Sequence, residues 1–209
     1  MQELKNVQIY KTLLEKYEIT KITLVPLLFQ TGYLTIKSRN LATDLLTLDF
    51  PNFEVEDSFF KHLIIDISEK EGHIATSILI KIEKAFVTND IDAFIEQLKI
   101  LYSGISYNLI DDKEKYYHSL FYLTLRIIGF NIDCEVETNV GRIDAVIKTN
   151  THIYVLEFKM GEAKKAIEQI KTKNYYQKYL SENKQIVLLG IGFNKRKKNI
   201  GNYLIDKIN

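Results

Sequence analysis

The first half of the chain has apolar residues at three- and four-residue steps. This spacing puts them on one face of an amphipathic helix, and it predicts a helix over residues 2–17 and further helices over residues 53–103. Between them, residues 21–50 predict a short helix, a turn at Gly32 and two strands of a small hairpin, which is compatible with a winged-helix-like unit over residues 20–60. We therefore expect a mostly helical N-terminal region with a small hairpin.

The second half of the chain alternates between helical and strand patterns. Residues 103–112 break the helical spacing, so we place the boundary of two domains, 1–108 and 109–209, in this segment. The second domain starts with a helix that ends near Gly129, since glycine is typical of helix C-termini. Three strands, a helix, a buried strand and a final strand or short helix follow. This order predicts an α/β fold in which helices flank a C-terminal mixed sheet.

The hairpin RIDAVIKTNTHIYVLEFK carries charged residues inside an otherwise apolar pattern. If its loop consists of Asn150 and Thr151, then Asp144 lies directly opposite Glu157, and Lys159 points to the same face. Directly opposed residues have Cβ atoms roughly 5 Å apart, so two carboxylates there repel each other unless a cation lies between them. The same register predicts an apolar opposite face, formed by Ile143, Ala145, Ile147, Tyr154, Leu156 and Phe158.

The three charged side chains of this hairpin suit the hydrolysis of a phosphodiester. Mg²⁺ binds carboxylates, water and phosphate oxygens. The ammonium group of Lys159 can hold a phosphate, steady an attacking water or tune its loss of a proton. The alternative is that Asp144, Glu157 and Lys159 are solvated residues on an exposed sheet. The surrounding strand is patterned for burial, and buried charges need compensation, which favours the functional interpretation.

Composition excludes several other classes of site. Cys134 is the single cysteine, so we expect neither a disulfide framework nor a cysteine zinc cluster, and a cytoplasmic location. We expect no membrane segment, because apolar runs fall far short of the ~20 residues of a span. We expect no secretory signal, because the N-terminal segment MQELKNVQIYKTLLEKYEIT carries acids and lacks an apolar core. Residues 1–158 carry 16 basic and 23 acidic residues, whereas residues 159–209 carry 12 and 4. The basic segment suits a polyanionic partner, although a solvated lysine-rich face is the other interpretation.

Several segments, taken in order, resemble a known family. The segments are YYHSLFYLTLRIIGF, NVGRIDAVI, IYVLEFK, a lysine-rich helix with Gln169, and IVLLGIGF, within residues 109–209. Together they resemble the PD-(D/E)xK nuclease domain that follows an AAA-ATPase-like domain in many bacterial proteins. Upstream, PLLFQTGYLTIK and LDFPNFEVEDSFF resemble the tail of the ATPase-like region. The resemblance implies a restriction-endonuclease-like fold, Mg²⁺ or Mn²⁺ as cofactor, and nucleic acid as partner, with DNA expected before RNA.

The resemblance also implies a role for each matching residue. Asp144 corresponds to the motif aspartate and Glu157 to the second acid, both of them metal ligands, and Lys159 corresponds to the catalytic lysine. Glu114 resembles the helical acid that completes the metal shell, and Gln169 resembles the helix glutamine of the exonuclease-like branch. Ile143 precedes Asp144, at the position where the family motif has a proline.

Further residues are candidates for contact with nucleic acid. Tyrosines can stack on bases, and a basic loop can contact phosphates. The candidates are Arg142, Tyr175, Tyr176, Lys195, Arg196 and Lys197. His118 follows Glu114 by one helical turn, and we interpret it as a packed histidine rather than a ligand.

Two functions remain open from the sequence. The chain has no G-x-x-x-x-G-K-[ST] segment, so we expect no ATP site in it and regard the Walker A portion of the ATPase-like region as absent. The first function is metal-dependent hydrolysis of phosphodiester bonds in nucleic acid. The alternative is a catalytically silent module that retains the nuclease fold and binds nucleic acid or protein.

Overall fold

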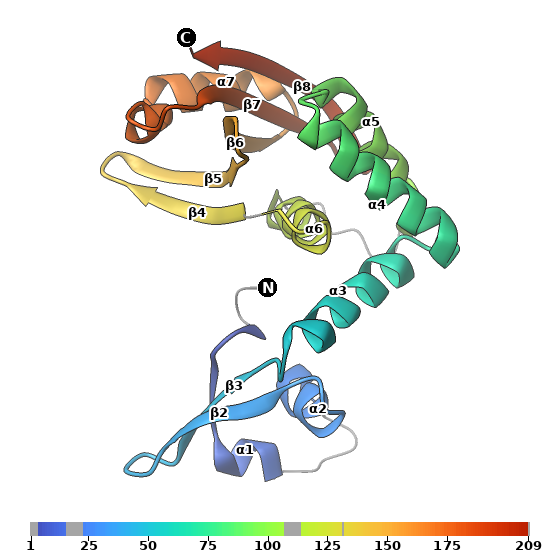
Figure 1. The fold of residues 1–209 in the computed structure, drawn as a ribbon, viewed down its shortest axis with the longest axis vertical. Helices are drawn as coiled ribbons and strands as arrows, with labels where there is room; N and C mark the ends of the chain where they lie inside the picture. Colours follow the sequence, from blue (N-terminus) through green and yellow to red (C-terminus); the bar gives the residue numbers. More distant parts are fainter. Residues whose placement is uncertain (1–3, 16–22, 107–113, 131, 209) are drawn as a thin grey trace. The chain divides into compact units, whose positions relative to one another are not determined.

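The structure is a computed structural model that describes residues 4–15, 23–106, 114–130 and 132–208. The chain divides into two compact units, Met1–Leu63 and Ile64–Asn209 (Figure 1). The division falls within helix α3 (Phe53–Ile67). The boundary that we expected from sequence near residue 108 lies inside the second unit, in a segment outside the described residues.

The first unit contains a three-stranded antiparallel sheet. Strand β3 (Leu45–Asp49) lies between β1 (Val7–Tyr10) and β2 (Thr35–Asn40). Helix α1 (Lys11–Glu15) follows β1, and α2 (Leu24–Gln30) precedes the hairpin of β2 and β3. The short helix and hairpin predicted from the sequence are therefore confirmed.

The helix predicted over residues 2–17 is wrong over Val7–Tyr10, which form a strand. Only Lys11–Glu15 are helical, and residues 16 and 17 lie outside the described residues. The segment VQIY is short enough to fit helical spacing and strand alternation equally. The pairing of Val7 with the fully buried Leu48 of β3 decides between them, because it supplies ladder hydrogen bonds that helical spacing alone does not.

The second unit is built on a five-stranded mixed sheet in the order β4-β5-β6-β7-β8. β6 and β7 are parallel, and the other neighbouring strands are antiparallel. The final segment of the chain is a strand, which settles the alternative left open by its sequence pattern. The strands are β4 (Ile132–Thr138), β5 (Gly141–Lys148), β6 (His152–Met160), β7 (Gln185–Asn194) and β8 (Asn199–Ile208).

Helices cover both faces of this sheet, as the apolar strands of its centre require. Phe121 of α6 packs edge-on against Phe158 of β6, with ring centroids 4.9 Å apart. On the opposite face, Ile170 of α7 belongs to one buried cluster with Val155 of β6. The α/β fold with a flanked mixed sheet is therefore confirmed. The helices are α4 (Gly72–Val87), α5 (Ile91–Tyr102), α6 (Glu114–Ile127) and α7 (Ala163–Thr172).

Helices α4 and α5 also pack against the sheet. Phe86 of α4 lies 4.4 Å from Tyr154 of β6, measured between ring centroids. The carboxylate of Asp90 caps α5 by accepting a hydrogen bond from the amide of Ala93 at 3.0 Å. Helices α4 and α5, which lie in the N-terminal half of the sequence, therefore belong to the second unit.

Candidate active site

The β5–β6 hairpin has the register that its hydrophobic pattern predicts. Ala145 pairs with Leu156, and the pairing runs to Lys148 and Ile153. A two-residue loop of Asn150 and Thr151 joins the strands, closed by a hydrogen bond from the Thr149 amide to the His152 carbonyl at 2.9 Å. The pairing ends one residue before Asp144 and Glu157, which still lie close enough for the charge of Asp144 to act on Glu157.

The hydrogen-bond ladder between β5 and β6 ends before Asp144, because the Asp144 carboxylate binds a backbone amide of β6. The amide of Phe158 donates to Asp144 Oδ2 at 2.8 Å. Ile143, which strict alternation puts on the face of Ala145, instead belongs to the cluster of Val146 on the α7 side. The predicted apolar face is therefore wrong at Ile143. A local shift in alternation at Asp144 explains this difference, and it is accompanied by a left-handed φ of 52° at Glu135 on the neighbouring strand β4.

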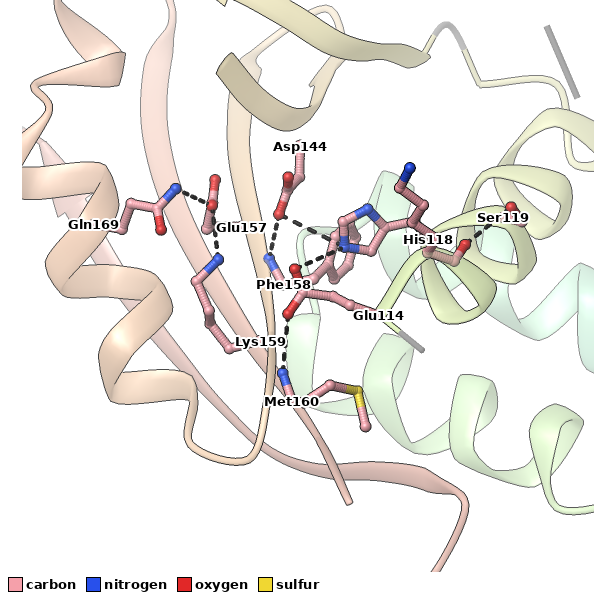
Figure 2. A network of polar contacts seen from close by, with 10 residues as sticks. Glu114, His118, Ser119, Asp144, Glu157, Phe158, Lys159, Met160 and Gln169 are labelled. Atoms are coloured by element: carbon pink, nitrogen blue, oxygen red, sulfur yellow. Dashed lines mark hydrogen bonds and ion pairs between the residues drawn. The ribbon is translucent and has the colours of Figure 1, made fainter. Parts of the chain in front are cut away.

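Helix α6 brings two further side chains to Asp144 (Figure 2). Glu114, the first residue of α6, accepts a hydrogen bond from the amide of Met160 through Oε2 at 3.1 Å. His118 lies one turn later, with Nε2 3.7 Å from Asp144 Oδ2 and 4.0 Å from Glu114 Oε1. Its ring packs against Phe158, with centroids 4.6 Å apart. The i,i+4 spacing on α6 therefore aims both side chains at the start of β5.

Glu114, His118 and Asp144 each offer a ligand atom, and these atoms lie within 4.8 Å of one another. Ligands about 2.1 Å from a metal ion are themselves about 3 to 4 Å apart. The separations of His118 Nε2 from Asp144 Oδ2, 3.7 Å, and from Glu114 Oε1, 4.0 Å, fall in this range. His118 Nε2 is buried and has no hydrogen-bond partner among the described residues. Burial lowers the pKa of His118, although Asp144 and Glu114 act to raise it, which favours the neutral imidazole that metals bind. The three residues therefore fit a divalent cation.

Glu157 lies beside this group rather than within it. Its side chain is 1% exposed, and Oε1 accepts hydrogen bonds from Lys159 Nζ at 3.1 Å and from the Gln169 amide of α7. Oε2 is buried without a hydrogen-bond partner among the described residues. Burial, and then the nearby charge of Asp144, raise the pKa of Glu157 to about 7. An added cation would favour its charged form.

Lys159 is the exposed end of this network. Burial acts to lower the pKa of Lys159, but the carboxylates of Glu157, Glu114 and Asp144 outweigh it, so the pKa is raised. The ammonium group remains charged and about a quarter of the side chain is exposed. Lys159 can therefore reach an anionic group placed next to the carboxylates.

The structure brings together all five residues that we expected at the catalytic centre. Asp144 and Glu114 fall within the potential metal group, and Glu157, Lys159 and Gln169 form the adjoining hydrogen-bonded network. His118 joins them, although the sequence led us to interpret it as a packed residue. Its i,i+4 spacing from Glu114 is a signal that could have identified it, but that spacing is common on any helix.

The residues expected to contact nucleic acid lie on separate elements. The ring of Tyr175 is 3% exposed and packs in the core, so its faces are not available for base stacking in this structure. Tyr176 is half-buried and donates to Asn174. Arg142 pairs with Glu135 at 3.4 Å on β4. The exposed residues Lys195, Arg196 and Lys197 form the turn after β7, at the sheet edge where β6 also ends.

Comparisons with known proteins agree with this geometry. An uncharacterized protein in the vnfD 5′ region of Azotobacter chroococcum mcd 1 is 28% identical to this chain over 215 residues, which cover 98% of the chain. The chain spans 42% of the length of that relative. No helix among the described residues is long and apolar enough to cross a membrane.

No solved structure gives a significant match to the chain. The profile of the PD-(D/E)XK nuclease superfamily matches residues 112–203, which include α6, α7, β7 and the β5–β6 hairpin.

Proposed function

We propose that the second unit hydrolyses phosphodiester bonds of nucleic acid in a metal-dependent reaction, with DNA as the substrate. The observation that carries the proposal is the meeting of Glu114, His118 and Asp144 with the Glu157–Lys159 pair at one edge of the sheet. The superfamily match over the same segment supports it.

Each residue has a proposed task in this reaction. Glu114, His118 and Asp144 would hold Mg²⁺ or Mn²⁺, with Glu157 as the further ligand that its unpartnered Oε2 makes available. A bound divalent cation polarises the phosphate and lowers the pKa of a water molecule. Lys159 holds a phosphate oxygen or orients the attacking water.

Gln169 has a positioning task. Its amide donates to Glu157 Oε1, which keeps the carboxylate fixed on the α7 side of β6. A carboxylate held by two donors keeps one orientation, and such outer partners commonly affect metal affinity and activity by 10- to 100-fold, in order of magnitude.

Three further proposals concern the first unit, the location of the protein and the contacts of the second unit with nucleic acid. The resemblance of the segments PLLFQTGYLTIK and LDFPNFEVEDSFF to the tail of an ATPase-like region supports a relation of the first unit to such a region. The single cysteine supports a cytoplasmic location. Arg142 and the basic turn of Lys195, Arg196 and Lys197 would contact the phosphate backbone, because they are exposed cations around the same sheet.

Isothermal titration of Mn²⁺ into wild type, Asp144→Asn and Asp133→Asn tests the metal centre. The asparagine at position 144 still offers an oxygen to the Phe158 amide, so the fold is retained while one charge is removed. Asp133 is an exposed residue of β4 and serves as the matched control. We expect binding in wild type and in Asp133→Asn, and its loss in Asp144→Asn. Equal binding in all three proteins would contradict the assignment.

A cleavage assay then tests catalysis. Labelled single- and double-stranded DNA and RNA are incubated with wild type and with Lys159→Met in the presence of Mn²⁺. We expect cleavage of DNA by wild type and none by the variant. A wild type that binds Mn²⁺ and leaves every strand intact would favour the silent binding module.

A further inference from the structure

A cavity of about 610 Å³ lies between the β4–β5 turn and the end of α7. Ligand pockets typically have volumes of about 300–1,000 Å³, so this cavity has room for one nucleotide. Its lining residues include Asn139, Asn174 and Gln177, which carry carboxamides, and Lys173 and Lys178, which carry ammonium groups. The described residues that line it include no carboxylate. The cavity therefore has mixed polar and apolar walls, and its lining residues carry positive charge.

Specific contacts hold the walls of this cavity at their separation. Lys173 Nζ donates to the Val140 carbonyl at 3.1 Å, which joins the end of α7 to the β4–β5 turn. Gly141 has a φ of 150°, and a Cβ there would lie 2.7 Å from the hydroxyl oxygen of Tyr175. Asn174 has a left-handed φ of 49° and turns the chain from α7 into the 3₁₀ helix η4 (Tyr175–Tyr179).

The cavity lies close to the candidate active site, because α7 and β5 each contribute residues to both. Lys173, the C-cap of α7, follows Gln169 by four residues and donates its amide to the Gln169 carbonyl, so it continues the same helix face about 6 Å further along the axis. Gly141 precedes Asp144 by three residues on β5, a distance of about 10 Å along the strand. A nucleic-acid strand with one phosphate at Asp144 can therefore reach the cavity with an adjacent nucleotide.

We propose that this cavity binds one nucleotide of the substrate strand and helps to choose which base stands there. The proposal rests on the proposed nuclease function and adds a binding site to it. Lysine ammonium groups contact phosphates, which position a strand. Carboxamides offer a donor and an acceptor together, which is the pattern that reads a base edge. Lys173 and Lys178 supply the first kind of group, and Asn139 and Gln177 supply the second.

Fluorescence anisotropy with a labelled single-stranded 12-mer tests the site. The measurement is made in EDTA, so that neither cleavage nor the metal centre contributes. The double variant Lys173→Gln/Lys178→Gln should bind at least 10-fold more weakly than wild type at low salt. Loss of two phosphate contacts should also reduce the slope of log K against log[salt] by about 1.4. DNA and RNA 12-mers are both used, and the strand whose binding falls identifies the sugar.

The matched control is Lys164→Gln/Lys165→Gln. These two lysines are exposed on the first turn of the same helix, away from the cavity. The control should bind within twofold of wild type, and thermal unfolding should show that both variants are folded. Equal losses in the two double variants would overturn the proposal, because the effect would then follow net charge alone.

The base-reading part has its own test. Wild type should discriminate at least fivefold among dA12, dC12 and dT12, and Gln177→Leu should reduce that ratio to below twofold. An unchanged ratio in Gln177→Leu overturns base reading in the cavity. If the lysine variants bind as tightly as wild type while Mn²⁺ still binds at Asp144, the cavity proposal fails and the nuclease proposal stands. A wild type that binds neither Mn²⁺ nor a 12-mer overturns both.

Discussion

Gly190 of β7 is a position where a single methyl group should displace α7 beside the candidate active site. A Cβ at Gly190 would lie 2.7 Å from the Ala163 carbonyl oxygen and 2.8 Å from Ile167 Cγ1. Ordinary contacts start at 3.4 Å, so the backbone of α7 must move away by about 0.7 Å. The first of these neighbours is backbone and cannot change rotamer. We therefore expect Gly190→Ala to destabilise the second unit by about 2 to 3 kcal/mol.

Thermal unfolding followed by circular dichroism measures this effect. At roughly 3 °C per kcal/mol, the expected fall in Tm is about 6 to 9 °C. Gly72→Ala is the matched control, because Gly72 starts α4 and a Cβ there meets nothing within 4 Å. The control should leave Tm unchanged or raise it slightly, since alanine narrows the unfolded ensemble. Equal Tm values for the two variants would refute the reasoning that α7 rests directly on this glycine.

Three other substitutions have definite expected outcomes. Gln169→Leu leaves Lys159 as the remaining side-chain donor to Glu157 Oε1. The kcat for cleavage should therefore fall by about 10- to 100-fold, measured against the exposed control Gln185→Leu. His118→Asp replaces a nitrogen ligand by oxygen, so the ratio of Mn²⁺ to Mg²⁺ affinity in titration calorimetry should fall; an unchanged ratio would remove His118 from the ligand set. Asp90→Ala removes the cap of α5 and should cost about 1 kcal/mol in urea unfolding, with no change in metal affinity.

Much of the second unit could be predicted from the sequence, because two independent signals agree there. In the β5–β6 hairpin, the position of a two-residue loop and the alternation of apolar residues demand the same register. That register puts Asp144 next to Glu157 without knowledge of the rest of the fold. Long apolar strands and amphipathic helices in the order found here allow few arrangements other than a flanked sheet.

The parts that could not be predicted depend on contacts between distant segments. β1 is a strand because β3 offers it a free edge, which is not visible in the four residues Val7–Tyr10. The shift at Asp144 arises because its carboxylate replaces a ladder acceptor for the Phe158 amide. The position of His118 depends on where α6 crosses the sheet, and helical spacing does not contain that information.

The glycines of β7 link the fold to the chemistry of the site. β6 and β7 are parallel, and in their register Glu157 pairs with Gly190 and Lys159 with Gly192. Neither glycine has room for a Cβ, because the start of α7 lies against both of them, and Gly161 and the Asn202 side chain also lie against Gly192. The missing side chains let α7 approach the sheet, and this approach brings Gln169 within hydrogen-bonding distance of Glu157. The segment E-x-K of β6 and the segment G-x-G of β7 therefore depend on each other: the two glycines let α7 lie where Gln169 can bind Glu157. If this is correct, Gly190→Ala should reduce activity by a larger factor than its loss of stability explains, because the same displacement separates Gln169 from Glu157.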